Sequence, residues 1–127
     1  MNVIIDTNFV ISCILKKIDF ISELEKLGFK VLVPMEMLQE MKDLKKNGKT
    51  SRQERVAIDL AQELLNEKGI KKITFGQGRL DVFLIERGKK GDYIATLDSG
   101  IKRMVPNRVV INSAKNGLMV ERLSFSK

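Results

Sequence analysis

The chain has 127 residues, of which 43% are hydrophobic, and we expect them to form a single domain over residues 1–127 with a buried core. Its 23 Lys and Arg outnumber its 16 Asp and Glu, and the net charge of +7 favours a polyanionic partner such as nucleic acid. The chain has no histidine and one cysteine, which excludes Ser-His-Asp catalysis, histidine-ligated zinc and an internal disulfide framework.

No segment has the features of a membrane span or a secretory signal. The N-terminal apolar run lacks a preceding basic region and is interrupted by Asp6, and no segment approaches the roughly 20 apolar residues that cross a bilayer. We therefore expect a soluble, cytoplasmic protein that does not contact membranes. Cys13 lies in the apolar stretch 9–15, where a buried and unreactive thiol is the expected state.

Short apolar runs alternate with amphipathic segments along the whole chain, and glycines follow several of them. Gly28 and Gly69 are placed to end helices, and Thr50 or Ser51 is placed to begin one. In chain order the expected elements are a strand over 2–5, helices over 8–15 and 18–27, a strand over 30–33, a helix beginning at Pro34, a long helix to about residue 68, a strand over 70–75, a helix over 79–88, a strand over 93–97, a short helix beginning at Asp98, and a strand over 108–111.

This alternation predicts an α/β fold with three α/β/α layers around a central, mainly parallel sheet of about five strands. Residues 117–123 either add an edge strand or end irregularly. Because right-handed crossovers bring the carboxyl ends of parallel strands to one edge, residues that follow the strands should meet there.

Acidic residues occur where strands or helices should bring them to that edge. Asp6 follows the first strand, Asp98 follows the fourth, Glu40 lies two turns into the helix after the second, and Asp81 opens the helix after the third. Carboxylate oxygens are the ligands that Mg²⁺ prefers, and a cation would relieve the repulsion among clustered acids. Together these residues predict a metal site.

Each acid also has a simpler interpretation. Asp6 and Asp98 are suited to capping the helices that follow them. Glu40 has Glu36 and Asp43 one turn to either side and could belong to an exposed acidic face, and Asp81 could complement a helix dipole.

The order and spacing of these motifs resemble those of the PIN-domain ribonucleases. The resemblance covers the whole chain and rests on Ile5-Asp6-Thr7-Asn8, Val33-Pro34 with Leu38-Gln39-Glu40-Met41, Asp81, and Ile94-Ala95-Thr96-Leu97-Asp98. The stretch 98–103 is similar to the archaeal and ribosomal-RNA-processing branch. Toxins of the family usually carry a further acid after Thr-x-Asp, where this chain has Ser99 and Gly100, and the acidic doublet often found at the third position is reduced to Asp81.

The resemblance implies a metal-dependent endoribonuclease that uses one or two Mg²⁺ or Mn²⁺ ions to hydrolyse single-stranded or structured RNA. Asp6, Glu40, Asp81 and Asp98 would be the catalytic and metal-binding acids, with Asn8 and Thr96 as supporting polar groups.

Cations around the expected loop after residue 44 and after Asp98 could bind the RNA backbone, or could form only a solvated charged face. Sequence-specific base stacking is not supported, because aromatic residues are scarce and Tyr93, the one tyrosine, is expected in the sheet core. The candidate RNA-binding residues are Lys45, Lys46, Lys49, Arg52, Arg55, Lys102 and Arg103.

Two other functions fit parts of the pattern. Asp6-Thr7-Asn8 faintly resembles the haloacid-dehalogenase phosphatase motif, although Asn8 replaces the second aspartate that such enzymes use. The domain could also be a catalytically weak RNA-binding or scaffold module, but its four acids would then oppose RNA binding. A homodimer is compatible with the apolar helix faces.

Overall fold

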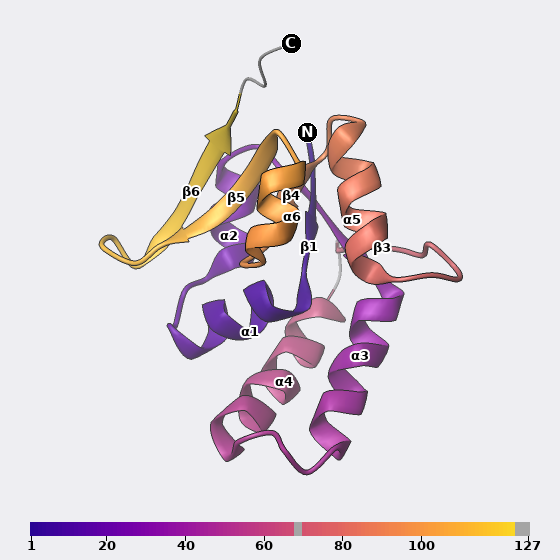
Figure 1. Cartoon of the computed structure of the whole chain (residues 1–127). Helices are drawn as coiled ribbons and strands as arrows, with labels where there is room; N and C mark the ends of the chain where they lie inside the picture. The colour runs from indigo at the N-terminus through magenta and orange to yellow at the C-terminus, as the bar shows by residue number, and fades with distance from the viewer. Residues whose placement is uncertain (68–69, 124–127) are drawn as a thin grey trace.

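The computed structural model describes residues 1–67 and 70–123, and Figure 1 shows a twisted sheet at its centre with helices on both faces. The sheet has six strands in the order β3-β2-β1-β4-β5-β6. In chain order the elements are β1 (Asn2–Ile5), α1 (Thr7–Leu15), α2 (Phe20–Lys26), β2 (Lys30–Pro34), α3 (Met35–Lys46), α4 (Arg52–Leu65), β3 (Lys71–Ile73), α5 (Leu80–Lys89), β4 (Tyr93–Ala95), α6 (Ser99–Met104), β5 (Asn107–Asn112) and β6 (Gly117–Arg122).

The first five strands are parallel, and the chain reverses its direction across the sheet between β1 and β4. β2 pairs with one side of β1 and β3 pairs with β2. β4 then pairs with the other side of β1, and β5 pairs with β4. The sheet agrees with the prediction of about five mainly parallel strands, and β6 adds an edge strand that pairs antiparallel with β5 through the turn around Asn116, which has a left-handed φ of 48°. Residues 117–122 therefore form the edge strand that the sequence left undecided.

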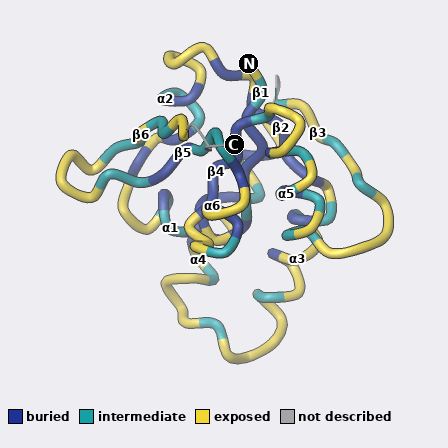
Figure 2. The backbone as a smooth tube through the Cα atoms, turned by 45° about the horizontal axis from the view of Figure 1, so that its top comes forward, coloured by how far each residue is buried: buried dark blue, intermediate teal, exposed yellow. Residues whose placement is uncertain are grey.

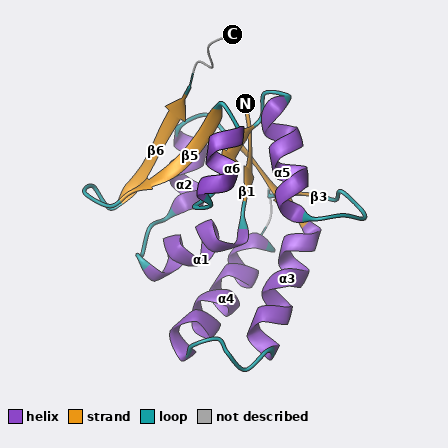
Figure 3. Ribbon diagram, in the orientation of Figure 1, coloured by secondary structure: helices purple, strands orange, loops and turns teal. Residues whose placement is uncertain are grey.

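The three predicted layers are confirmed. The four helices α1 to α4 cover one face of the sheet, where the larger core contains Val3, Ile5, Phe9 and Met37, and α5 and α6 cover the other, where a smaller core contains Ile4. Neighbouring residues of β1 point to opposite faces, as the period of a strand requires. Figure 2 shows the buried central strands, such as β1 and β4, and the exposed loops, and Figure 3 shows the same fold coloured by secondary structure.

Element boundaries differ from the expected ones where tertiary contacts decide them. Pro34 is the last residue of β2 rather than the first of a helix, because its pairing with Ile73 keeps it extended. The strand expected over 93–97 ends at Ala95, since Thr96 turns toward the site described below. The long helix ends at Leu65, and the predicted helix stop at Gly69 lies outside the described residues.

Two further expectations can be compared with the structure. Cys13 is fully buried, and burial, reinforced by Glu23 and opposed by Lys16, raises the pKa of its thiol to about 12, in agreement with an unreactive core cysteine. Tyr93 packs in the core against Phe29, as expected. Among the described residues, no helix combines the length and hydropathy that a membrane span needs.

The contact of α5 with α6 depends on Gly88. A Cβ added at this buried position would lie 2.8 Å from Val105 Cβ and 3.2 Å from Ile94 Cγ1. We expect Gly88→Ala to lower the free energy of unfolding by about 1–3 kcal/mol through overpacking, despite the better helix propensity of alanine. Denaturant titration measures this, with Lys89→Ala as the control on the same helix. A more stable Gly88→Ala variant would contradict the proposed packing.

Candidate metal centre

A cavity of about 490 Å³ opens at the carboxyl edge of the sheet, and the four predicted acids line it. Asp6 and Asp98 follow β1 and β4, the two strands on either side of the point where the chain order reverses, which is where ligands bind in open α/β sheets. Glu40 reaches the cavity from α3 and Asp81 from the first turn of α5. Asn8 also lines it, from the first turn of α1.

Asp6 is held by hydrogen bonds to both of its carboxylate oxygens. The backbone N–H of Thr7 donates to Oδ1 at 2.8 Å, and the hydroxyl of Thr96 donates to Oδ2 at 2.9 Å. The backbone N–H of Asp6 donates to the carbonyl of Ala95 at 3.0 Å, which continues the pairing of β1 with β4 beyond the strands. Asp6 therefore has a fixed orientation and also serves as the N-cap of α1.

Thr96 connects Asp6 to Asp98. Its hydroxyl oxygen accepts a hydrogen bond from the backbone N–H of Asp98 at 3.1 Å while its proton is donated to Asp6. Thr96 is fully buried, so it orients the acids and does not itself line the cavity. Asp98 Oδ1 accepts from the N–H of Ile101 at 3.0 Å and caps α6. The capping interpretation and the site interpretation of Asp6 and Asp98 are thus compatible.

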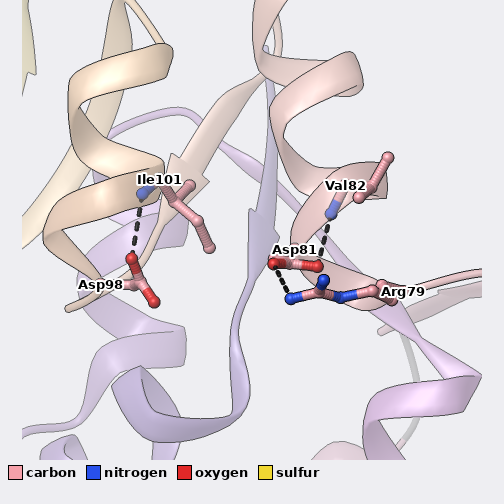
Figure 4. Close-up of polar contacts among 5 residues, drawn as sticks. All are labelled: Arg79, Asp81, Val82, Asp98 and Ile101. Atoms are coloured by element: carbon pink, nitrogen blue, oxygen red, sulfur yellow. Dashed lines mark hydrogen bonds and ion pairs between the residues drawn. The ribbon is translucent and has the colours of Figure 1, made fainter.

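Asp81 is paired with a cation of its own chain. Arg79 Nη2 lies 2.8 Å from Asp81 Oδ2, and the N–H of Val82 donates to Oδ1 at 2.9 Å. Figure 4 shows Asp81 turned to Arg79 at the start of α5, and Asp98 turned to Ile101 at the start of α6. The Arg79 side chain is 79% exposed, so this ion pair contributes little to stability and can open at little cost.

Glu36 lines the cavity but is not among the predicted site residues. It lies one helical turn before Glu40 on α3, and the i, i+4 spacing of two acids after a strand was the available signal. Its Oε2 accepts hydrogen bonds from the hydroxyl of Thr74 and, at 3.1 Å, from the N–H of Gly76. Burial raises the pKa of Glu36, but these bonds outweigh it and hold the pKa below its usual value. Glu36 thus anchors the loop between β3 and α5.

The surroundings of Asp6 shift the pKa of its carboxyl. Burial raises the pKa of its carboxyl most strongly, the hydrogen bonds from Thr96 and Thr7 oppose this, and the negative charges of Asp98 and Asp81 raise the pKa further. The net shift is upward, so the charged form of Asp6 is disfavoured in the absence of a cation. Carboxylates that face one cavity and repel one another are suited to binding a divalent cation, because the cation neutralises their charge.

The donors of the cavity fit a hard divalent cation better than zinc, since they are oxygens and the chain has no histidine. Within residues 1–67 and 70–123, however, no three acidic or cysteine side chains are placed closely enough to hold one ion together. Asp81 is turned toward Arg79, and Asp98 toward the N–H of Ile101 in its own helix.

The candidate RNA-binding cations lie outside this cavity. Lys45, Lys46, Lys49, Arg52 and Arg55 occupy the far end of the α3–α4 hairpin, away from the sheet (Figure 1). Lys45 pairs with Asp59, and Arg55 donates to the carbonyl of Thr50 at 2.6 Å, so both are partly committed to the hairpin. Lys102 and Arg103 lie on α6, within two turns of Asp98. In the part of the chain that the structure describes, the one cation lining the cavity is Arg79, which was not predicted.

The raised pKa of Asp6 predicts a pH effect on the metal-free protein. Because the folded pKa lies above the ordinary value of 3.8, the stabilisation associated with protonated Asp6 is complete below that value and is lost as the pH rises through the folded pKa. In chelator, Asp6→Asn should therefore gain stability relative to the wild type as the pH rises from 3.8 through the folded pKa of Asp6, and the difference should be constant above it. Thermal melts across pH measure this, with Asp43→Asn on α3 as control, and a pH-independent difference would contradict it.

Comparison with known proteins agrees with the predicted family. A family model described as a PIN-like domain matches residues 3–112. The solved structure of the PIN domain endonuclease Utp24 matches with a TM-score of 0.72 at 19% identity, over 99% of this chain and 95% of that one, which shows a shared fold. Among curated protein sequences there is no significant match. With a family match that spans most of its length, the chain belongs to the PIN-like domain family.

Proposed function

We propose that this protein is a metal-dependent endoribonuclease. The observation that carries the proposal is the convergence of Asp6, Glu40, Asp81 and Asp98 on one cavity at the strand switch point, in a chain without histidine. Membership of the PIN-like family supports a nuclease-type function and favours it over a phosphatase. The fold shared with the PIN domain endonuclease Utp24 is compatible with this proposal. The absence of an acid at Ser99 and Gly100 favours a role in RNA processing over a role as a toxin.

Asp6, Glu40, Asp81 and Asp98 would hold the metal, for which Mg²⁺ and Mn²⁺ are the candidates because all four ligands are carboxylates. When bound, such a cation supplies Lewis acidity toward a phosphodiester. The chain's own residues keep the ligands in place: Thr96 fixes Asp6 relative to Asp98, and Asn8 adds an amide at the cavity wall. Arg79, which lines the same cavity and is largely exposed, would be able to leave Asp81 and pair with a substrate phosphate.

A catalytically weak RNA-binding module is the second candidate. It is favoured by one observation, namely that no three acids of the described residues are spaced to share one ion. The two candidates differ in a direct assay, because a binding module retains RNA affinity without cleaving RNA in any divalent cation.

Cleavage of labelled single-stranded RNA should depend on the metal. We expect activity with Mg²⁺ or Mn²⁺, no activity in excess chelator, and recovery when the metal is restored. Asp6→Asn and Asp98→Asn should fall to the level of the chelated protein, because each removes a negative ligand. Glu63→Gln, an exposed position on α4 away from the cavity, is the matched control. Undiminished cleavage in chelator would refute the mechanism.

RNA binding by the cations of the α3–α4 hairpin can be tested separately from metal binding by the acids. Replacing Lys46, Lys49 and Arg52 with alanine should weaken RNA binding and reduce the log–log salt slope by roughly 0.7 for each phosphate that is no longer neutralised. Metal affinity should not change, because these residues lie away from the acids.

The matched control for this variant removes three lysines elsewhere, Lys26, Lys30 and Lys115. Unchanged RNA affinity and salt slope in the hairpin variant would show that the hairpin is only a solvated face. Lys102 and Arg103 on α6 would then be the remaining predicted RNA contacts.

A further inference from the structure

Among the described residues, a single aromatic ring lines the acidic cavity. This residue, Phe75, lies on the loop between β3 and α5, is half-buried, and belongs to neither of the two buried cores. Its ring stacks on that of Phe83, with centroids 4.7 Å apart and an interplanar angle of 21°. Phe83 does pack against the smaller core, so Phe75 is the outer member of a stack that leads from the core to the cavity.

Arg87, in the last turn of α5, holds the Phe83 ring of this stack. The guanidinium carbon of Arg87 lies 5.6 Å from the centroid of the Phe83 ring, at a distance typical of a cation–π contact. Arg87 Nε in turn donates to Asp92 Oδ2 at 2.6 Å. Asp92 and Arg87 therefore fix the ring on which Phe75 lies.

The loop that carries Phe75 is held from the other side. Glu36 accepts hydrogen bonds from Thr74 and Gly76, the two residues that flank Phe75. Gly76 has a φ of 78°, a conformation that glycine adopts without strain. The position of the ring is thus determined on both sides before any ligand binds.

An aromatic ring held beside the proposed site of phosphodiester cleavage suits a nucleobase as its ligand. The acids of the cavity weaken the binding of a phosphate when no cation is present, whereas a nucleobase is uncharged and can stack on a ring without base-specific hydrogen bonds. Inside a duplex the neighbouring base pairs cover both faces of a base, so an internal base offers an open face only when it is unstacked. We propose that Phe75 is a stacking platform for an unpaired nucleobase next to the phosphodiester at the acids.

This inference rests on the proposed function and deepens it. The competing explanation is that Phe75 merely covers Phe83. The two differ in what an abasic nucleotide does, because removing a base from the RNA takes away the partner of Phe75 and leaves the packing of Phe75 on Phe83 unchanged.

The test measures binding of a short single-stranded RNA in chelator, where it is not cleaved, to the wild type and to Phe75→Leu. Leucine keeps an apolar contact with Phe83, and a thermal melt checks that the variant is folded. We expect Phe75→Leu to bind the RNA roughly 5- to 150-fold more weakly, the range for removal of one base–aromatic stack. Leu60→Ala, an exposed apolar position on α4, is the matched control and should bind as the wild type does.

A scan of abasic positions along the same RNA then completes a double-mutant cycle. For the wild type, one abasic position should cost about as much affinity as Phe75→Leu does, and for Phe75→Leu the same position should cost little. A blunt-ended RNA duplex of the same sequence has open base faces only at its two ends, so Phe75→Leu should weaken its binding much less than that of the single strand.

Two outcomes would overturn the inference, and they are distinguishable. If the wild type binds and cleaves RNA but Phe75→Leu responds to every abasic position as the wild type does, the stacking platform is refuted and the ribonuclease proposal stands. If the wild type neither binds nor cleaves any RNA, both proposals are refuted. If Phe75→Leu does not fold, Phe75→Met replaces it in the same cycle, since methionine keeps the apolar contact and lacks the planar ring.

Discussion

The parallel pairing of β1 with β4 is the constraint on which the site depends. These strands flank the point where the chain order reverses, and the crossovers that leave them run to opposite sides, which opens the space beyond their carboxyl ends. The pairing continues one residue past β1, where the N–H of Asp6 donates to the carbonyl of Ala95. The next residue, Thr96, donates to Asp6 and accepts from Asp98. Backbone pairing and one buried hydroxyl thus set two acids from opposite ends of the sequence in register.

The same arrangement lowers the stability of the metal-free fold. Burial disfavours the charged form of Asp6, and Asp98 and Asp81 add repulsion. Hydrogen bonds from Thr7 and Thr96 offset part of this cost. Asp98 and Asp81 each contact their own element, Asp98 at the start of α6 and Asp81 through Arg79. Although these acids line one cavity, no three acids among the described residues are spaced to hold one ion.

Glu36 and Phe75 show how the wall of the cavity is built. The two face it from elements distant in sequence, α3 and the β3–α5 loop, and the carboxylate of Glu36 accepts bonds from both neighbours of Phe75. An acid that the sequence grouped with an exposed helix face therefore has a structural role, and a phenylalanine outside both cores has a fixed place at the cavity. Neither assignment follows from residue type, because each depends on a contact across about 40 residues of chain.

The sequence by itself determined the layered α/β architecture, the positions of most strands and helices, and the four acids at the strand and helix ends, because these follow from local periodicity and capping. Only the tertiary structure decided the rest. Pairing with neighbouring strands set the ends of β2 and β4 and added β6 as an antiparallel edge. The path of the β3–α5 loop in the fold decided that Arg79 enters the cavity and that Phe75 stacks on Phe83, and a contact across the fold decided that Glu36 holds this loop. The physical reason is that a side chain's partners across the fold are set by which elements pack together, and a single local pattern does not encode this.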